Sequence, residues 1–164
     1  MACGMLIIVG PLFRRRSSVK LFVGMVVLAT LCLSEDSSTA WKQSELIEPS
    51  ALAKALDSTD SPYVVCVSDS VPYRSRHIAH AIFAGPGDKP EGIELLKAAA
   101  SVFSKDEIIV IYCGCCPLNK CPNVRPAYTA LKESGFRHVR VLDVMTDMES
   151  EWYRRGYPSE SAGK

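Results

Sequence analysis

The chain alternates between short apolar runs and longer stretches in which apolar residues recur every three or four positions. A continuous apolar run lies at 63–67, and further strand-like runs rich in β-branched residues lie at 107–112 and 139–142. A continuous run such as 63–67 is typical of a strand that is buried on both faces of a sheet. Shorter strand candidates lie at 45–47 and 81–83. The pattern therefore predicts about five strands, all of them short.

Helical patterns fill the intervals between these strands. Ser50 is expected to cap one helix that ends at Leu56. Asn123 is expected to cap another helix, which Gly135 ends. Strands that alternate with helices predict an α/β fold with a parallel sheet covered on both faces. The expected helices are 49–56, 73–78, 90–103 with Leu95, Leu96 and Ala99 on one face, 123–134 with Val124, Ala127, Tyr128 and Leu131 on one face, and 148–155.

The first 40 residues have the pattern of an export segment. A basic cluster at 14–20 precedes an apolar run at 21–33, and small residues follow at 38–40. This order predicts a signal peptide, and with it a periplasmic or extracellular protein. The apolar run is short for a transmembrane helix, which needs about 20 residues. An uncleaved membrane anchor and an N-terminal helix packed in the core remain the alternatives.

Composition limits the possible functions. A chain of 164 residues with 48% hydrophobic residues suits one packed domain. The formal net charge is +1, so electrostatic capture of nucleic acid is not indicated. The expected partners are a small molecule or another protein, with membrane contact only through residues 21–33 if they are not cleaved.

The densest candidate chemistry is a loop with four cysteines between the clearest strand and the following helix. The loop holds Cys113, Cys115, Cys116 and Cys121, and Arg125 lies just beyond it. A thiol at a strand-to-helix turn lies among backbone N–H groups and near a helix N-terminus, and both features lower a cysteine pKa. Cys113 is the candidate nucleophile because it ends the strand. Cys121 and Cys116 are the runners-up.

The same four cysteines allow other interpretations. Sulfur-only ligation suits zinc, copper(I) or an iron–sulfur cluster. Local disulfides could instead fix the loop, and paired thiols could form a redox site. The odd cysteine count left after removal of residues 1–40 favours at least one free thiol. The fifth cysteine, Cys66, lies inside an apolar run and is expected to be a small buried hydrophobe.

Residues 41–158 resemble the rhodanese-like sulfurtransferase family, in several pieces that occur in the family's order. The resemblance implies one rhodanese-like domain at 41–158, which would follow the export segment and linker at 1–40 and precede a short tail at 159–164. The matching pieces are Tyr73 with His77-Ile78 and Ala81, the strand 109–113, the segment 131–136, Val139 with Val141-Leu142, and Trp152 with 156–158.

The resemblance implies an enzyme that moves sulfane sulfur through a cysteine persulfide, with no cofactor. The donor would be of the thiosulfate or persulfide class, and the acceptor would be a thiol or a cyanide-like molecule. Cys113 would carry the sulfur, and Arg125 would hold the anionic donor. The residues expected to bind substrate are Gly114, Cys115, Lys120, Asn123 and Val124.

Two differences from the family pattern bear on function. Eleven residues separate Cys113 from Arg125, more than the family's active loop holds. Loop length sets the size of the pocket in this family, so the identity of the substrate stays open. The alternative to an enzyme is a module of the same fold whose cysteine loop binds a metal or a partner protein, or acts as a thiol redox site.

Overall fold

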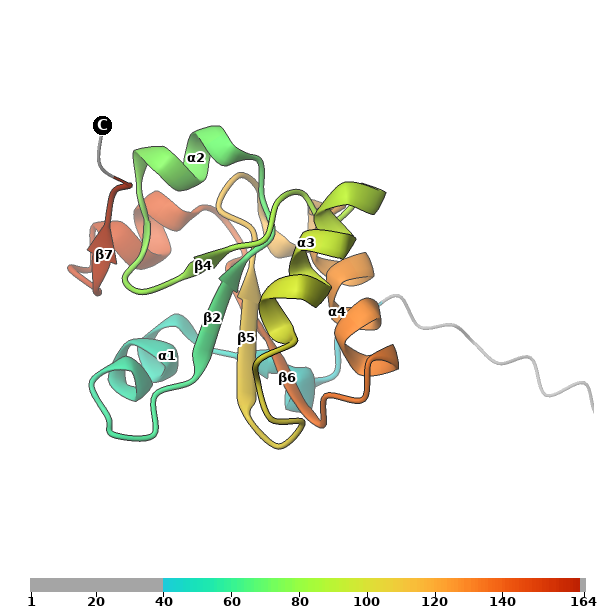
Figure 1. Cartoon of the computed structure of the whole chain (residues 1–164). Coiled ribbons are helices and arrows are strands. Elements are labelled where there is room, and N and C mark those ends of the chain that lie inside the picture. Colours follow the sequence, from blue (N-terminus) through green and yellow to red (C-terminus); the bar gives the residue numbers. More distant parts are fainter. Residues whose placement is uncertain (1–39, 163–164) are drawn as a thin grey trace, which may run out of the picture. The chain divides into compact units, whose positions relative to one another are not determined.

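The computed structural model describes residues 40–162. Its centre is a five-stranded, entirely parallel sheet with the strand order β1-β6-β5-β2-β4 (Figure 1). The predicted α/β class and the five-stranded parallel sheet are therefore confirmed. The strands of this sheet are β1 (Leu46–Ile47), β2 (Tyr63–Cys66), β4 (Ile82–Phe83), β5 (Ile108–Tyr112) and β6 (His138–Leu142).

Helices lie on both sides of the sheet, as Figure 1 shows with α1 on one side and α3 and α4 on the other. Side chains alternate between the faces along a strand. Val65 and Ile111 accordingly join the hydrophobic cluster that includes Leu131 of α4. Val64 and Val110 join the cluster on the other face, which contains Trp152. The helical segments are α1 (Pro49–Leu56), α2 (Ser70–Ser75), α3 (Pro90–Ala100), α4 (Val124–Glu133), the short turns η1 (Gln43–Glu45) and η2 (Leu118–Lys120), and the π-helical η3 (Glu149–Tyr153).

The segment 73–78, expected to be a helix, is divided between two elements. α2 begins earlier, at Ser70, and ends at Ser75. His77–Ile78 then form a strand, β3, which pairs antiparallel with β7 (Ser159–Glu160). This pairing is long-range, so a local pattern does not contain it. β7 lies in the segment that was predicted to be a C-terminal tail.

Two further helix predictions need correction. Glu48 occupies the N-cap position of α1, and Ser50 lies inside that helix, because Pro49 takes the first helical position. In α3, Leu95 is 52% exposed, whereas Leu96 is fully buried. The buried face of α3 follows the spacing of Gly92, Leu96 and Ala100. α3 also ends at Ala100, three residues before the predicted end.

The end of α4 is as predicted. Gly135 has φ +89°, a left-handed conformation that glycine adopts without a Cβ clash. Within residues 40–162, no helix is both long enough and apolar enough to cross a membrane. The export segment predicted for residues 1–40 lies outside the described residues, apart from Ala40.

Candidate functional site: a cysteine cluster at the end of β5

Cys113 follows the last residue of β5, the middle strand of the sheet. The cysteine loop therefore begins at the carboxyl end of a central parallel strand, where sites form in sheets of this type. The Leu118 N–H donates a hydrogen bond of 2.8 Å to the Val144 carbonyl. This bond ties the middle of the loop to the segment that follows β6.

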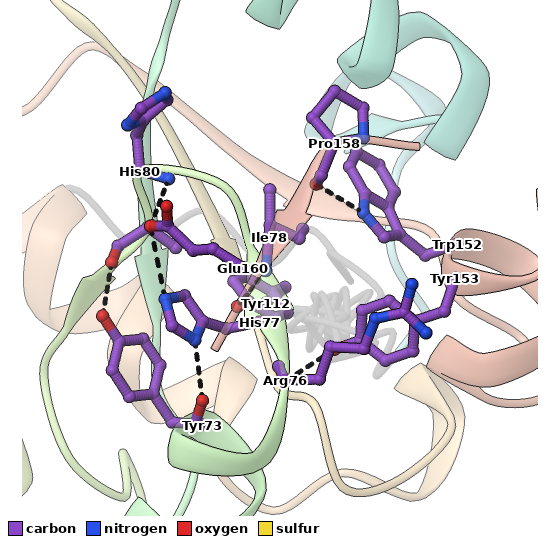
Figure 2. Close-up of polar contacts among 11 residues, drawn as sticks. Tyr73, Arg76, His77, Ile78, His80, Tyr112, Trp152, Tyr153, Pro158 and Glu160 are labelled. Atoms are coloured by element: carbon purple, nitrogen blue, oxygen red, sulfur yellow. Dashed lines mark hydrogen bonds and ion pairs between the residues drawn. The ribbon is translucent and has the colours of Figure 1, made fainter. Parts of the chain in front are cut away.

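The residue before Cys113 is also fixed. The hydroxyl oxygen of Tyr112 accepts a hydrogen bond of 3.2 Å from the Ile78 N–H, a contact drawn in Figure 2. Tyr112 is buried, and burial raises the pKa of its hydroxyl well above the usual value. A neutral, hydrogen-bonded tyrosine thus anchors the end of β5 to β3.

A polar network surrounds β3 and β7 (Figure 2). His77 is buried, and its Nδ1 lies 2.7 Å from the Tyr73 carbonyl oxygen, while its Nε2 lies 3.4 Å from Glu160. The Trp152 Nε1–H donates to the Pro158 carbonyl at 3.0 Å. The His77 ring therefore links the backbone of α2 to Glu160 of β7, which is a structural role.

The thiols of the loop lie in contact with one another. The Sγ atom of Cys113 is 3.0 Å from that of Cys115 and 3.9 Å from that of Cys116, and the last two are 3.4 Å apart. All five cysteines in residues 40–162 are free thiols. Cys113 is 5% exposed, whereas Cys115 is exposed. The cluster thus joins one nearly buried sulfur to one at the surface.

Asn123 has a role that the sequence does not reveal. Its side-chain Nδ2 donates to Cys113 Sγ at 3.4 Å, and its Oδ1 accepts from the Asp88 N–H at 3.2 Å. Asn123 does occupy the N-cap position of α4. Within the described chain, however, its side chain makes these two contacts in place of the predicted bond to an N–H of that helix.

The hydrogen-bond donors around Cys113 lower the pKa of its thiol to about 5. The largest cause is the hydrogen bond from the Cys121 thiol, which outweighs the opposing effect of burial. The Cys115 thiol, the Cys115 N–H and the Asn123 amide lower the pKa further. Cys113 is therefore the sulfur that ionises first, and it is a thiolate at neutral pH.

The pKa values of the other three thiols of the loop are raised, so Cys113 is the thiol that carries the charge. The pKa of Cys121 is raised, mainly by the hydrogen bond that it donates to Cys113. Burial raises the pKa of Cys115 most, and the neighbouring Cys113 thiol raises it further. Burial also raises the pKa of Cys116, although its hydrogen bonds with Cys121 and Cys115 act in the opposite direction. Of the three candidate nucleophiles, Cys113 is thus the one whose thiol pKa is lowered.

Arg125 lies on the first turn of α4, with its guanidinium carbon 3.3 Å from the centre of the Trp41 ring. The donors that lower the pKa of the Cys113 thiol include Cys121, Cys115 and Asn123. Trp41 precedes β1, so the contact joins segments distant in the sequence, and no local pattern predicts it.

Two cavities adjoin the loop. The larger, of about 740 Å³, is lined by Trp41, Leu118, Cys121, Arg125, Asp143 and Met145, among others. The smaller, of about 10 Å³, lies beside Cys113 and includes Cys116, Cys121 and Val124 in its lining. A molecule in the larger cavity would meet Arg125 and the Cys121 thiol together, which keeps Cys121 as the second candidate nucleophile.

The remaining predicted binding residues differ in their surroundings. Lys120 is exposed at the end of η2. Val124 is buried in the core. It lines the small cavity together with Cys113, Cys116 and Cys121. Gly114 is partly buried, and a Cβ there would have its nearest contact at 3.9 Å.

Three of the sulfurs are arranged so that a thiophilic metal ion would fit. The ligand atoms of Cys113, Cys115 and Cys116 lie within 4.8 Å of one another. Thiolates about 2.3 Å from a tetrahedral zinc ion are separated by somewhat less than 4 Å. The separations of 3.4 and 3.9 Å agree with this spacing, and only small shifts would open the 3.0 Å pair. Soft sulfur ligands suit zinc or copper(I).

Comparison with known proteins identifies the fold. No protein-family model matches the sequence, and no curated protein matches it. Among solved structures, the BH2092 protein of Bacillus halodurans is 24% identical with a TM-score of 0.56, over 73% of this chain and 78% of that one. The rhodanese-like domain of the Alr3790 protein from Anabaena sp. is 23% identical with a TM-score of 0.52, over 71% and 79%.

A third solved structure is an enzyme. The thiosulfate sulfurtransferase of Pseudomonas aeruginosa is 23% identical with a TM-score of 0.52, over 74% of this chain and 22% of the enzyme. Together with the parallel sheet and the cysteine loop at the end of β5, these similarities show that residues 40–162 adopt the rhodanese-like fold. The predicted fold is thereby confirmed.

Proposed function

We propose that the protein is a sulfurtransferase in which Cys113 carries sulfane sulfur as a persulfide. One observation carries the proposal: Cys113 ends the middle strand of a rhodanese-like fold, and its sulfur lies among the Cys121, Cys115 and Asn123 donors that keep it ionised. A thiolate is the form of cysteine that acts as a nucleophile. A solved structure with the same fold is a thiosulfate sulfurtransferase, which supports this class of reaction.

The reaction divides into two displacements at sulfur. In the first, the Cys113 thiolate attacks the outer sulfur of the donor; a new S–S bond forms at Cys113, and the bond inside the donor breaks. Thiosulfate would leave as sulfite, and an organic persulfide would leave as a thiol. In the second, an acceptor thiolate or cyanide attacks the carried sulfur, and Cys113 leaves as a thiolate. The same donors that lower its pKa make it a good leaving group.

Arg125 is proposed to bind anionic donors. Its guanidinium lies over Trp41 at the edge of the larger cavity, and a planar guanidinium matches an oxyanion. Replacement by glutamine should raise KM for thiosulfate about tenfold, the effect of losing one charge-assisted hydrogen bond. KM for an uncharged organic trisulfide should change little. An equal effect on both donors would count against this role.

The test of the proposal is thiocyanate formation from cyanide, with thiosulfate and an organic persulfide as alternative donors. The Cys113→Ser variant should lose turnover with every donor. Cys66→Ser is the matched control, because Cys66 is buried next to Ser68 in the core and outside the loop. Full activity of Cys113→Ser would reject Cys113 as the nucleophile, and loss in Cys121→Ser alone would move the role to Cys121.

The second candidate function is binding of zinc or copper(I) by the loop, favoured by the mutual proximity of the Cys113, Cys115 and Cys116 sulfurs. Elemental analysis of the purified full chain, before and after treatment with a chelator, tests it. Stoichiometric metal in the wild type and its loss in Cys115→Ser would favour this function. Retention of sulfurtransferase activity after metal removal would favour the first.

The location of the protein is a separate proposal. We infer from the basic and apolar pattern of residues 1–40 that the chain is exported. The mass of the mature protein recovered from cells would show whether a leader is removed. An unprocessed chain in the cytoplasm would contradict export.

A further inference from the structure

We propose that Cys115 resolves the Cys113 persulfide, so that the protein releases its sulfur as hydrosulfide and becomes oxidised in the same step. The inference rests on the proposed function, because it needs a persulfide at Cys113. It adds the identity of the acceptor, which is a thiol of the same chain, and the class of co-reactant, which is a dithiol reductant.

Proximity singles out Cys115 as the acceptor. Its Sγ lies 3.0 Å from that of Cys113, closer than the 3.9 Å that separates Cys116 from Cys113. A group held in contact reacts as if present at a concentration far above that of any thiol in solution.

The small cavity beside Cys113 offers space for the carried sulfur. Cys116 and Cys121 are in the lining of this cavity. Its volume of about 10 Å³ holds little more than one small molecule, and so it suits the single added sulfur atom.

The step balances without any further oxidant. Cys115 gives up its proton, and its sulfur forms a bond to Cys113 Sγ. The bond between Cys113 Sγ and the terminal sulfur breaks, and that sulfur takes the electron pair and the proton and leaves as hydrosulfide. The sulfane sulfur is reduced by two electrons, and the two thiols are oxidised to a disulfide. The proton that Cys115 gives up is the one that the leaving sulfur takes.

Regeneration of the site requires two electrons from an external dithiol. The disulfide would have its surface sulfur at Cys115, which is exposed, so a dithiol of thioredoxin type or dithiothreitol can attack it. The attack breaks the Cys113–Cys115 bond, and the second thiol of the reductant displaces Cys115. Turnover would therefore consume one dithiol for each hydrosulfide released.

A single-turnover experiment tests the inference. The reduced full chain is freed of reductant, exposed to glutathione persulfide, desalted, and analysed for free sulfide and for intact mass. The wild type should release about one equivalent of sulfide and lose two hydrogens, with peptide mapping placing the disulfide between Cys113 and Cys115. Cys115→Ser should retain one added sulfur and release no sulfide. Because Cys115 is exposed, this substitution leaves the core unchanged.

Each alternative outcome has a definite meaning. A wild type that keeps its added sulfur would overturn the resolving role and leave the proposed function standing. Equal sulfide release by wild type and Cys115→Ser would also overturn it. Loss of release in Cys116→Ser instead would assign the role to Cys116 and reject Cys115. Absence of both added sulfur and sulfide in every variant would overturn the inference together with the proposed function.

Discussion

Asn123 donates a hydrogen bond to the Cys113 sulfur while accepting one from the backbone of Asp88, so its amide is held at both ends. Asn123→Ala removes one donor from the Cys113 thiolate. A hydrogen bond to a charged group is worth about 1.5 kcal/mol at the low end, and one pKa unit corresponds to about 1.4 kcal/mol. The midpoint of pH-dependent alkylation at Cys113 should therefore rise by about one unit.

The matched control for that substitution is Asn119→Ala, at an exposed position of the same loop. Its alkylation midpoint at Cys113 should equal that of the wild type. An unchanged midpoint in Asn123→Ala, or the same shift in both variants, would show that the Asn123 amide does not stabilise the thiolate.

Alkylation of the wild type should follow the ionisation of Cys113. Since the pKa of this thiol is lowered to about 5, the thiolate fraction is complete near neutral pH and falls as the pH drops through about 5. Iodoacetamide labelling quantified by peptide should be independent of pH from about 6.5 to 8 at Cys113. At Cys115, whose pKa is raised, labelling should be slower despite its exposure. Faster labelling at Cys115 than at Cys113 at neutral pH would contradict this assignment.

Gly87 is packed against the residue that orients the thiolate. A Cβ at this position would lie 2.3 Å from the Asn123 carbonyl oxygen. Gly87→Ala should therefore force the start of α4 to move, at a cost of about 1–3 kcal/mol in the free energy of unfolding. The alkylation midpoint of Cys113 should rise as in Asn123→Ala. Wild-type values for both quantities would mean that the loop adapts without moving Asn123.

Trp152 lies in the hydrophobic cluster on the sheet face opposite α4. It is fully buried, its Nε1–H bonds the Pro158 carbonyl, and its ring meets Tyr157 with centroids 5.1 Å apart. Trp152→Ala should lower the free energy of unfolding by about 3–5 kcal/mol in denaturant titrations. Trp41→Ala, at a half-buried position, provides the comparison and should cost less. A smaller loss for Trp152 than for Trp41 would contradict the assignment of the core.

The strands were predictable because each is a local property of the sequence. The runs that became β2 and β5 consist mainly of buried apolar residues. β6 was predicted from Val139, Val141 and Leu142, which are buried, although Arg140 between them is exposed. The left-handed end of α4 at Gly135 is equally local. The pairing of β3 with β7 was missed because it joins residues about 80 positions apart, and a helical pattern over 73–78 concealed it.

The site could be predicted only in part, for a similar reason. Its position at the end of β5 and the candidate Cys113 follow from the strand and the loop that comes after it. The contacts that specify its chemistry come from elsewhere in the chain: Asp88 positions Asn123, and Trp41 holds Arg125. Helix-cap preference predicted that the Asn123 side chain accepts a hydrogen bond from an N–H of α4. Its actual partner, the Asp88 N–H, lies in a distant loop, and no local sequence pattern indicates that contact.

The most direct test of the central claim is the location of sulfur in the Cys115→Ser chain after brief exposure to glutathione persulfide. Peptide mass mapping at neutral pH should find one added sulfur on Cys113, with Cys116 and Cys121 unmodified. The added sulfur on Cys116 or Cys121, with Cys113 unmodified, would contradict the claim that the hydrogen-bonded thiolate at the end of β5 carries the reaction.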